Sequence, residues 1–101
     1  MSQQHTLGPG DVVRFGTMAF SGNTMVFMQN LDDRYRGRAR VRPVGSEVTD
    51  LSRKLLGNSF YTQWEEAIEP NQFKELQFKY AGAIMEVSNI GHTQLKVWTD
   101  L

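Results

Sequence analysis

The chain has 101 residues, of which 40% are hydrophobic and 22% are charged, and its formal net charge is zero. These values are typical of one globular domain and argue against intrinsic disorder. The chain has no cysteine, which excludes disulfides, thiolate metal sites and a cysteine nucleophile. Residues 1–10 lack the basic start and apolar run of a signal peptide, and no run of about 18 apolar residues occurs. We therefore expect a cytoplasmic protein without a membrane partner.

The N-terminal third predicts a tail followed by a β-hairpin. Residues 1–10 are polar and end in Gly-Pro-Gly, which predicts a flexible tail closed by a turn, and one β-rich domain then covers residues 11–101. Side chains alternate with a period of two from Val12 to Phe20, as in a strand. Ser-Gly-Asn at residues 21–23 is typical of a turn. A returning strand is predicted from Thr24 to Met28.

The next segment carries a regular row of arginines. Between Arg34 and Arg42 every second residue is an arginine, and the residues between them are Tyr35, Gly37, Ala39 and Val41. A strand directs such alternating sets to opposite faces. The pattern predicts a third strand with five guanidinium groups on one side. Pro43 lacks the N–H that a sheet needs, so we expect the strand to end there or to lie at an edge.

The middle of the chain favours helix. Thr49 or Asp50 can cap a first helix that ends at Gly57. A second helix is predicted over residues 60–68, because its apolar residues share one helical face and Pro70 blocks continuation; these residues are Phe60, Trp64, Ala67 and Ile68. A strand from Phe60 to Trp64 is the alternative, since aromatic residues and threonine favour sheets.

The C-terminal third returns to strand periodicity. Apolar residues alternate with polar ones over residues 75–80, and the alternation resumes over residues 83–87 and 95–98, with a turn between residues 88 and 93. Leu95 and Val97 fall on one face. The predicted fold is therefore mostly β, a β-rich α+β domain. Two antiparallel three-stranded meanders, separated by the short helical segment, would form a small open barrel or a bent sheet.

The usual signatures of catalysis do not occur in this sequence. His5 and His92 are far apart in the sequence, and the adjacent acids at 32–33 and 65–66 point away from each other in a strand or helix. The Gly-Pro-Gly at residues 8–10 lacks the lysine and hydroxyl of a phosphate-binding loop, and no Gly-x-Ser-x-Gly elbow exists. We therefore expect no catalytic residues, no metal and no cofactor. A small enzyme without a recognisable motif is the remaining alternative.

The arginine row is the strongest functional signal in the sequence. Five of the eleven positively charged residues lie within nine positions, and arginine forks suit carboxylates and phosphates. The sequence predicts a non-catalytic binding module or accessory subunit that docks an acidic protein surface. The predicted partner-binding residues are Arg34, Tyr35, Arg36, Arg38, Arg40 and Arg42.

Three other interpretations of this row are open. Nucleic acid could bind the same face, with Tyr35 stacking on a base, although a sequence pI near 6.7 is low for that class. The row could be a solvated edge that deters aggregation. It could also form ion pairs inside the fold with Glu65, Glu66 and Glu69.

Overall fold

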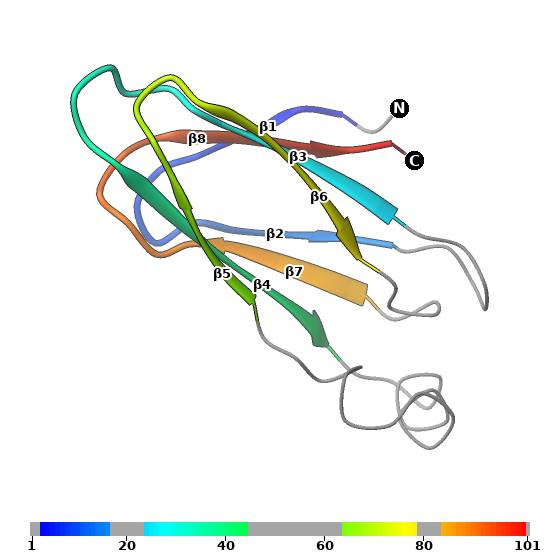
Figure 1. Cartoon of the computed structure of the whole chain (residues 1–101). Helices are drawn as coiled ribbons and strands as arrows, with labels where there is room; N and C mark the ends of the chain where they lie inside the picture. Colours follow the sequence, from blue (N-terminus) through cyan, green and yellow to red (C-terminus); the bar gives the residue numbers. More distant parts are fainter. Residues whose placement is uncertain (1–2, 17–23, 45–63, 79–83, 101) are drawn as a thin grey trace.

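The computed structural model describes residues 3–16, 24–44, 64–78 and 84–100, and these segments contain eight β-strands (Figure 1). The strands are β1 (His5–Leu7), β2 (Val12–Phe15), β3 (Thr24–Asn30), β4 (Gly37–Val44), β5 (Trp64–Ile68), β6 (Phe73–Phe78), β7 (Ile84–Asn89) and β8 (Leu95–Thr99). No helix in this described part has the length and hydropathy needed to span a bilayer.

The strands form two four-stranded sheets that lie in two layers (Figure 1). The first, called the β1 sheet, has the order β1-β8-β3-β6, and the second, called the β2 sheet, has the order β2-β7-β4-β5. Every neighbouring pair is antiparallel. Sequential strands mostly alternate between the layers, and this strand order is that of a jelly roll built from two Greek keys.

The core lies between the two layers and follows directly from period-two patterning. Alternate residues of each strand point inward, and the innermost of them are completely buried, as at Val26 and Met28 of β3 or Ala39 and Val41 of β4. The other fully buried apolar residues are Ile68, Met85, Val87, Leu95 and Val97. These side chains supply the apolar burial that stabilises the sandwich.

Two buried asparagines tie the loops at one end of the sandwich. Asn30, the last residue of β3, donates to the carbonyl oxygens of Tyr35 and Ile68, at 2.8 and 3.0 Å, and its side-chain oxygen accepts from the Asp32 N–H. Asn89, the last residue of β7, makes the same set of three bonds, to Leu7, Thr93 and Gly91. Each buried amide is thus satisfied, and each joins three chain segments.

The N-terminal segment contains a strand where the sequence suggested only a tail. His5–Leu7 forms β1 and pairs with β8. His5 is half-buried, and its ring meets the edge of Phe15 at a centroid distance of 5.6 Å. The expected turn follows, with Gly10 at a φ of 85°, a conformation that glycine adopts at low cost. The segment is too short for a clear alternating pattern, which is why the sequence did not reveal β1.

Strands occur at the predicted places within the described residues, although β4 begins at Gly37 and not at Arg34, and their pairing differs from two meanders. β2 and β3 were expected to form a hairpin; instead β2 pairs with β7 in one sheet, and β3 pairs with β6 and β8 in the other. Alternation specifies which side chains face the core and leaves the neighbouring strand open. The architecture is accordingly a two-layer sandwich of open sheets and not one barrel or bent sheet.

The predicted second helix is wrong where the structure describes it. Trp64–Ile68 forms β5, which pairs with β4. Residues four apart share a face in a helix and also in a strand, so the spacing of Trp64 and Ile68 fits both. Glu66 distinguishes the two structures. A helix with this apolar face would expose Glu66, whereas in β5 the residue is half-buried. The first helix, over residues 49–57, and residues 60–63 lie outside the described residues.

Candidate functional site

Three of the predicted arginines lie side by side on one face, as the alternation predicted. Arg38, Arg40 and Arg42 point outward from β4, while the intervening Ala39 and Val41 are completely buried. β4 is a central strand, with β7 on one side and β5 on the other. The expectation that this strand ends at Pro43 or lies at an edge is wrong, because β4 continues to Val44 and Pro43 pairs with Met85 of β7. The pairing with β5 ends at Val41 among the described residues.

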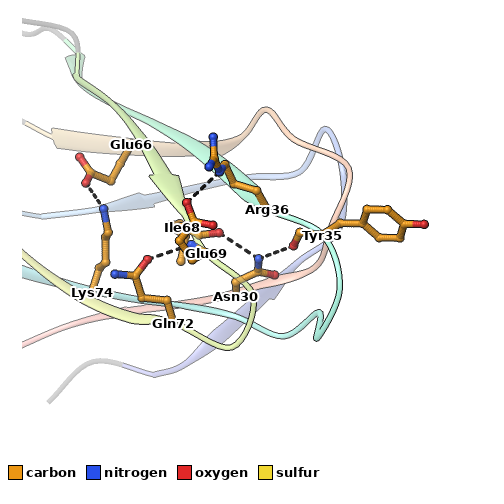
Figure 2. Close-up of polar contacts among 8 residues, drawn as sticks. All are labelled: Asn30, Tyr35, Arg36, Glu66, Ile68, Glu69, Gln72 and Lys74. Atoms are coloured by element: carbon orange, nitrogen blue, oxygen red, sulfur yellow. Dashed lines mark hydrogen bonds and ion pairs between the residues drawn. The ribbon is translucent and has the colours of Figure 1, made fainter.

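Arg34, Tyr35 and Arg36 lie in the loop before β4, at the end of the sandwich. The Asp32 carboxylate accepts from the N–H groups of Arg34 and Tyr35, at 2.7 and 2.8 Å, and these bonds hold the pKa of Asp32 below its usual value. Asn30 fixes the Tyr35 carbonyl. Figure 2 shows the Tyr35 ring pointing away from this network, and the ring is exposed.

Four charged residues in and beside β4 and β5 form two ion pairs. Arg36 meets Glu69 at 2.8 Å and Arg38 meets Glu65 at 2.9 Å. The alternative of internal pairing is therefore correct for these two arginines. All four side chains are about half exposed, so each pair is screened and stabilises the fold by less than about 1 kcal/mol.

Glu66 pairs with Lys74 instead of an arginine (Figure 2). The two residues come from β5 and β6, the edge strands of different sheets, so their ion pair joins the two layers at this edge. Glu66 also accepts from the indole N–H of Trp64. Burial raises the pKa of the Glu66 carboxyl, but the Lys74 and Trp64 hydrogen bonds outweigh burial and lower it.

A carboxylate holds two arginines together at the centre of the β2 sheet. Glu86 of β7 stands between Arg14 of β2 and Arg42 of β4, because the register pairs it with both. The Arg14 Nε donates to Oε2 at 3.0 Å, with Nη2 2.9 Å from the same oxygen, and the Arg42 Nε donates to Oε1 at 2.8 Å. The Glu86 side chain is 6% exposed, whereas those of Arg14 and Arg42 are 64% and 48% exposed.

Glu86 is the negatively charged partner in this triad at neutral pH. Burial raises the pKa of its carboxyl, but hydrogen bonds and charge from Arg42 and Arg14 outweigh burial and hold the pKa below its usual value. The triad therefore has a net charge of +1. Its carboxylate is covered and its two guanidiniums face solvent, so the surface presents positive groups in fixed positions.

Arg40 differs from its neighbours because no carboxylate of the described residues pairs with it. Its neighbours across the sheet are Ser88 on β7 and Glu65 on β5, but Glu65 binds Arg38. The Arg40 Nε is covered from solvent and has no hydrogen-bond partner within the described segments. A buried donor without an acceptor costs stability.

The outer face of the β2 sheet thus carries an excess of positive charge, and we call its four arginines the arginine face; they are Arg14, Arg38, Arg40 and Arg42. Four guanidiniums stand against the two carboxylates of Glu65 and Glu86, a surplus of +2 among the described residues. The sequence did not indicate Arg14 or Glu86. Arg14 does occupy a polar phase of the predicted strand, but its place beside Arg42 depends on β7 lying between β2 and β4.

The described residues offer no other evident chemistry. No group of three histidine, aspartate or glutamate side chains among residues 3–16, 24–44, 64–78 and 84–100 is placed to hold a metal ion. His92 is exposed in the turn between β7 and β8, and His5 lies in β1 against Phe15. Comparisons with protein-family models, curated proteins and solved structures found no match.

Proposed function

We propose that this chain is a non-catalytic binding module that docks an acidic protein surface through the arginine face. The observation that carries the proposal is Arg40, which has no carboxylate partner among the described residues and lies between the ion-paired Arg38 and Arg42 on a face with a surplus of +2. Like charges on one sheet face repel. A negative partner surface would neutralise that surplus.

The geometry of the face suits recognition more than solubility alone. Guanidiniums that are held by hydrogen bonds lose less freedom when they bind a second acceptor. Arg14 and Arg42 are held in this way by Glu86, and Arg38 is held by Glu65. Arg38, Arg40 and Arg42 lie on a central strand of the sheet, whereas charges that deter aggregation act at edge strands.

A protein partner fits this face better than nucleic acid does. Exposed apolar side chains border the arginines on the same outward face, at Val12 of β2 and Ile84 of β7. Apolar contacts beside charged ones are typical of protein interfaces, whereas a nucleic-acid site needs a continuous basic track along the phosphates.

The test is a capture experiment with the full chain, its Arg40→Glu variant and a matched control. Arg40→Glu reverses the charge on the arginine face that no carboxylate of the described residues pairs, and Lys96→Glu reverses a charge on the outer face of the β1 sheet. Acidic proteins that bind the wild type and the Lys96→Glu variant should be lost with Arg40→Glu. Direct binding of each purified candidate should weaken as salt rises. Equal binding by all three chains removes the arginine face from the account, and a low-salt gel shift that Arg40→Glu abolishes favours nucleic acid instead.

A further inference from the structure

The arrangement around Glu86 leaves many arginine donors unused. Each guanidinium has five N–H groups in a planar fork. Arg14 directs its Nε and Nη2 at Glu86, and Arg42 directs only its Nε there. The Nη1 of Arg14 and both Nη atoms of Arg42 make no hydrogen bond with any described residue. Both side chains are about half exposed or more, so a ligand above the sheet can reach them.

Charge adds a second constraint on the ligand. Arg40 lies two residues from Arg42 on the same face of β4 and opposite Ser88 of β7, the strand that carries Glu86. Three guanidiniums and one carboxylate give this cluster a net charge of +2. The pairing of Arg38 with Glu65 keeps that neighbouring charge balanced. The cluster is therefore a compact dication bordered by a neutral ion pair.

We infer that the cluster of Arg14, Arg40 and Arg42 binds a phosphomonoester carried by a phosphorylated side chain of the partner protein. A phosphomonoester has a charge of about −1.5 to −2 at neutral pH and three strong acceptor oxygens. It matches the surplus of the cluster and can accept from more than one guanidinium. A carboxylate has a single charge and two oxygens, so it neutralises half of the surplus. This inference rests on the proposed function.

Glu86 has a positioning role in this account. Its side chain is 6% exposed and those of Arg14 and Arg42 are 64% and 48% exposed, so a ligand above the sheet would meet the guanidiniums and not the carboxylate. Its two oxygens fix the directions of the two guanidiniums, because Oε2 accepts a hydrogen bond from Arg14 and Oε1 accepts one from Arg42. Arginine forks fixed in advance bind a tetrahedral oxyanion with less loss of side-chain freedom.

The experiment titrates the isotopically labelled full chain with three small probes and follows the backbone amide signals by NMR. The probes are N-acetyl-phosphoserine amide, N-acetyl-aspartate amide and a short oligothymidine. We expect phosphoserine to shift amides around Arg14, Arg40, Arg42 and Ser88, with an affinity roughly tenfold above that of aspartate. Arg40→Gln should lower the phosphoserine affinity roughly tenfold, and Lys96→Gln, on the other sheet, should leave it unchanged. The circular dichroism of each variant verifies folding.

Equal affinities for phosphoserine and aspartate would overturn the inference, and so would shifts outside the arginine face. Oligothymidine that binds this face more tightly than phosphoserine would also overturn it, in favour of nucleic acid. The two proposals can fail separately. If phosphoserine does not bind but Arg40→Glu still loses an acidic partner, the docking function stands and the phosphate specificity falls. If Arg40→Glu loses no partner while phosphoserine binds, the anion site stands and the docking function falls.

Discussion

On the outer face of the β1 sheet the side chains that meet across strands are aromatic, whereas on the outer face of the β2 sheet they are charged. Phe27, Phe73 and Trp98, called here the aromatic cluster, come from β3, β6 and β8, and their ring centroids lie 5.6 to 6.0 Å apart. Each ring meets the other two. The three rings of the aromatic cluster thus pack against one another across the strands.

The charges of the arginine face are not fully compensated by neighbouring charges of the described residues. Its described charges leave a surplus of +2, and one arginine is without a carboxylate. Two faces of one sandwich, with the same antiparallel backbone, therefore differ in what remains after folding. We propose that the aromatic cluster contributes stability and that the arginine face contributes recognition, with Glu86 contributing to both.

The largest effect is expected when Glu86 is removed. Glu86→Ala leaves Arg14 and Arg42 beside each other without a counter-charge, so the free energy of unfolding should fall by about 2–4 kcal/mol. Glu65→Ala is the matched control, because the Arg38–Glu65 pair is exposed, and its loss should cost less than about 1 kcal/mol. Urea unfolding measures both changes. Equal losses of unfolding free energy in the two variants would show that the buried Glu86 stabilises the fold no more than the exposed Glu65 does.

The aromatic cluster is broken by Phe27→Ala. Phe27 sits on the central strand of the three and contacts both other rings, so its removal should lower the free energy of unfolding by about 2 kcal/mol. Phe73 lies on the edge strand β6 and is about half exposed, so Phe73→Ala should cost about half as much. Thermal and urea unfolding would measure both variants. Neither substitution should alter binding at the arginine face, and a loss of binding there would contradict the division of roles.

Acid should weaken the β2 sheet through Glu86. The pKa of Glu86 in the folded chain lies below the ordinary glutamate value of 4.5, so its contribution is complete above that value and is lost as the pH falls through the folded pKa. The free energy of unfolding should therefore decline below about pH 4.5, and Glu86→Gln should flatten the decline. Unfolding curves at a series of pH values test this, and an unchanged slope in the variant would count against it.

The smallest effect concerns the exposed ion pair of Arg38 and Glu65. A double-mutant cycle with Arg38→Ala and Glu65→Ala should give a coupling energy below about 1 kcal/mol. The coupling should shrink further in high salt, because exposed charges are screened. A larger or salt-independent coupling would show that Arg38 is committed to folding and is not available to a partner.

Much of the strand content followed from local alternation, and most of the pairing did not. The phase of β4 is legible because its arginines alternate with small or apolar residues, and the outward direction of Arg38, Arg40 and Arg42 follows from that phase. The segment of β3 is apolar on both faces, so the sequence predicts the strand but not its phase. The partner of each strand is a long-range property: Arg14 and Glu86 are separated by 72 positions and meet only because β2 pairs with β7. Sequence periodicity contains no information about such a contact.

The arginine site was predictable in part for the same reason. The row of arginines on β4 is visible in the local sequence, but the carboxylates that neutralise them come from β5 and β7, which are distant in the sequence. Arg36 and Arg38 find Glu69 and Glu65, Arg42 finds Glu86, and Arg40 finds no acid among the described residues. The error at Trp64–Ile68 has a different origin, since a spacing of four residues fits a helix and a strand equally.

The most direct test of the central claim is an NMR titration of the labelled chain with an acidic peptide, a decamer of glutamate, for the wild type and the Arg40→Glu variant. We expect amide shifts confined to β2, β4 and β7 that weaken with salt and disappear in the variant, while the signals of β3, β6 and β8 around the aromatic cluster stay in place. Shifts that survive Arg40→Glu, or that fall on the β1 sheet, would contradict it.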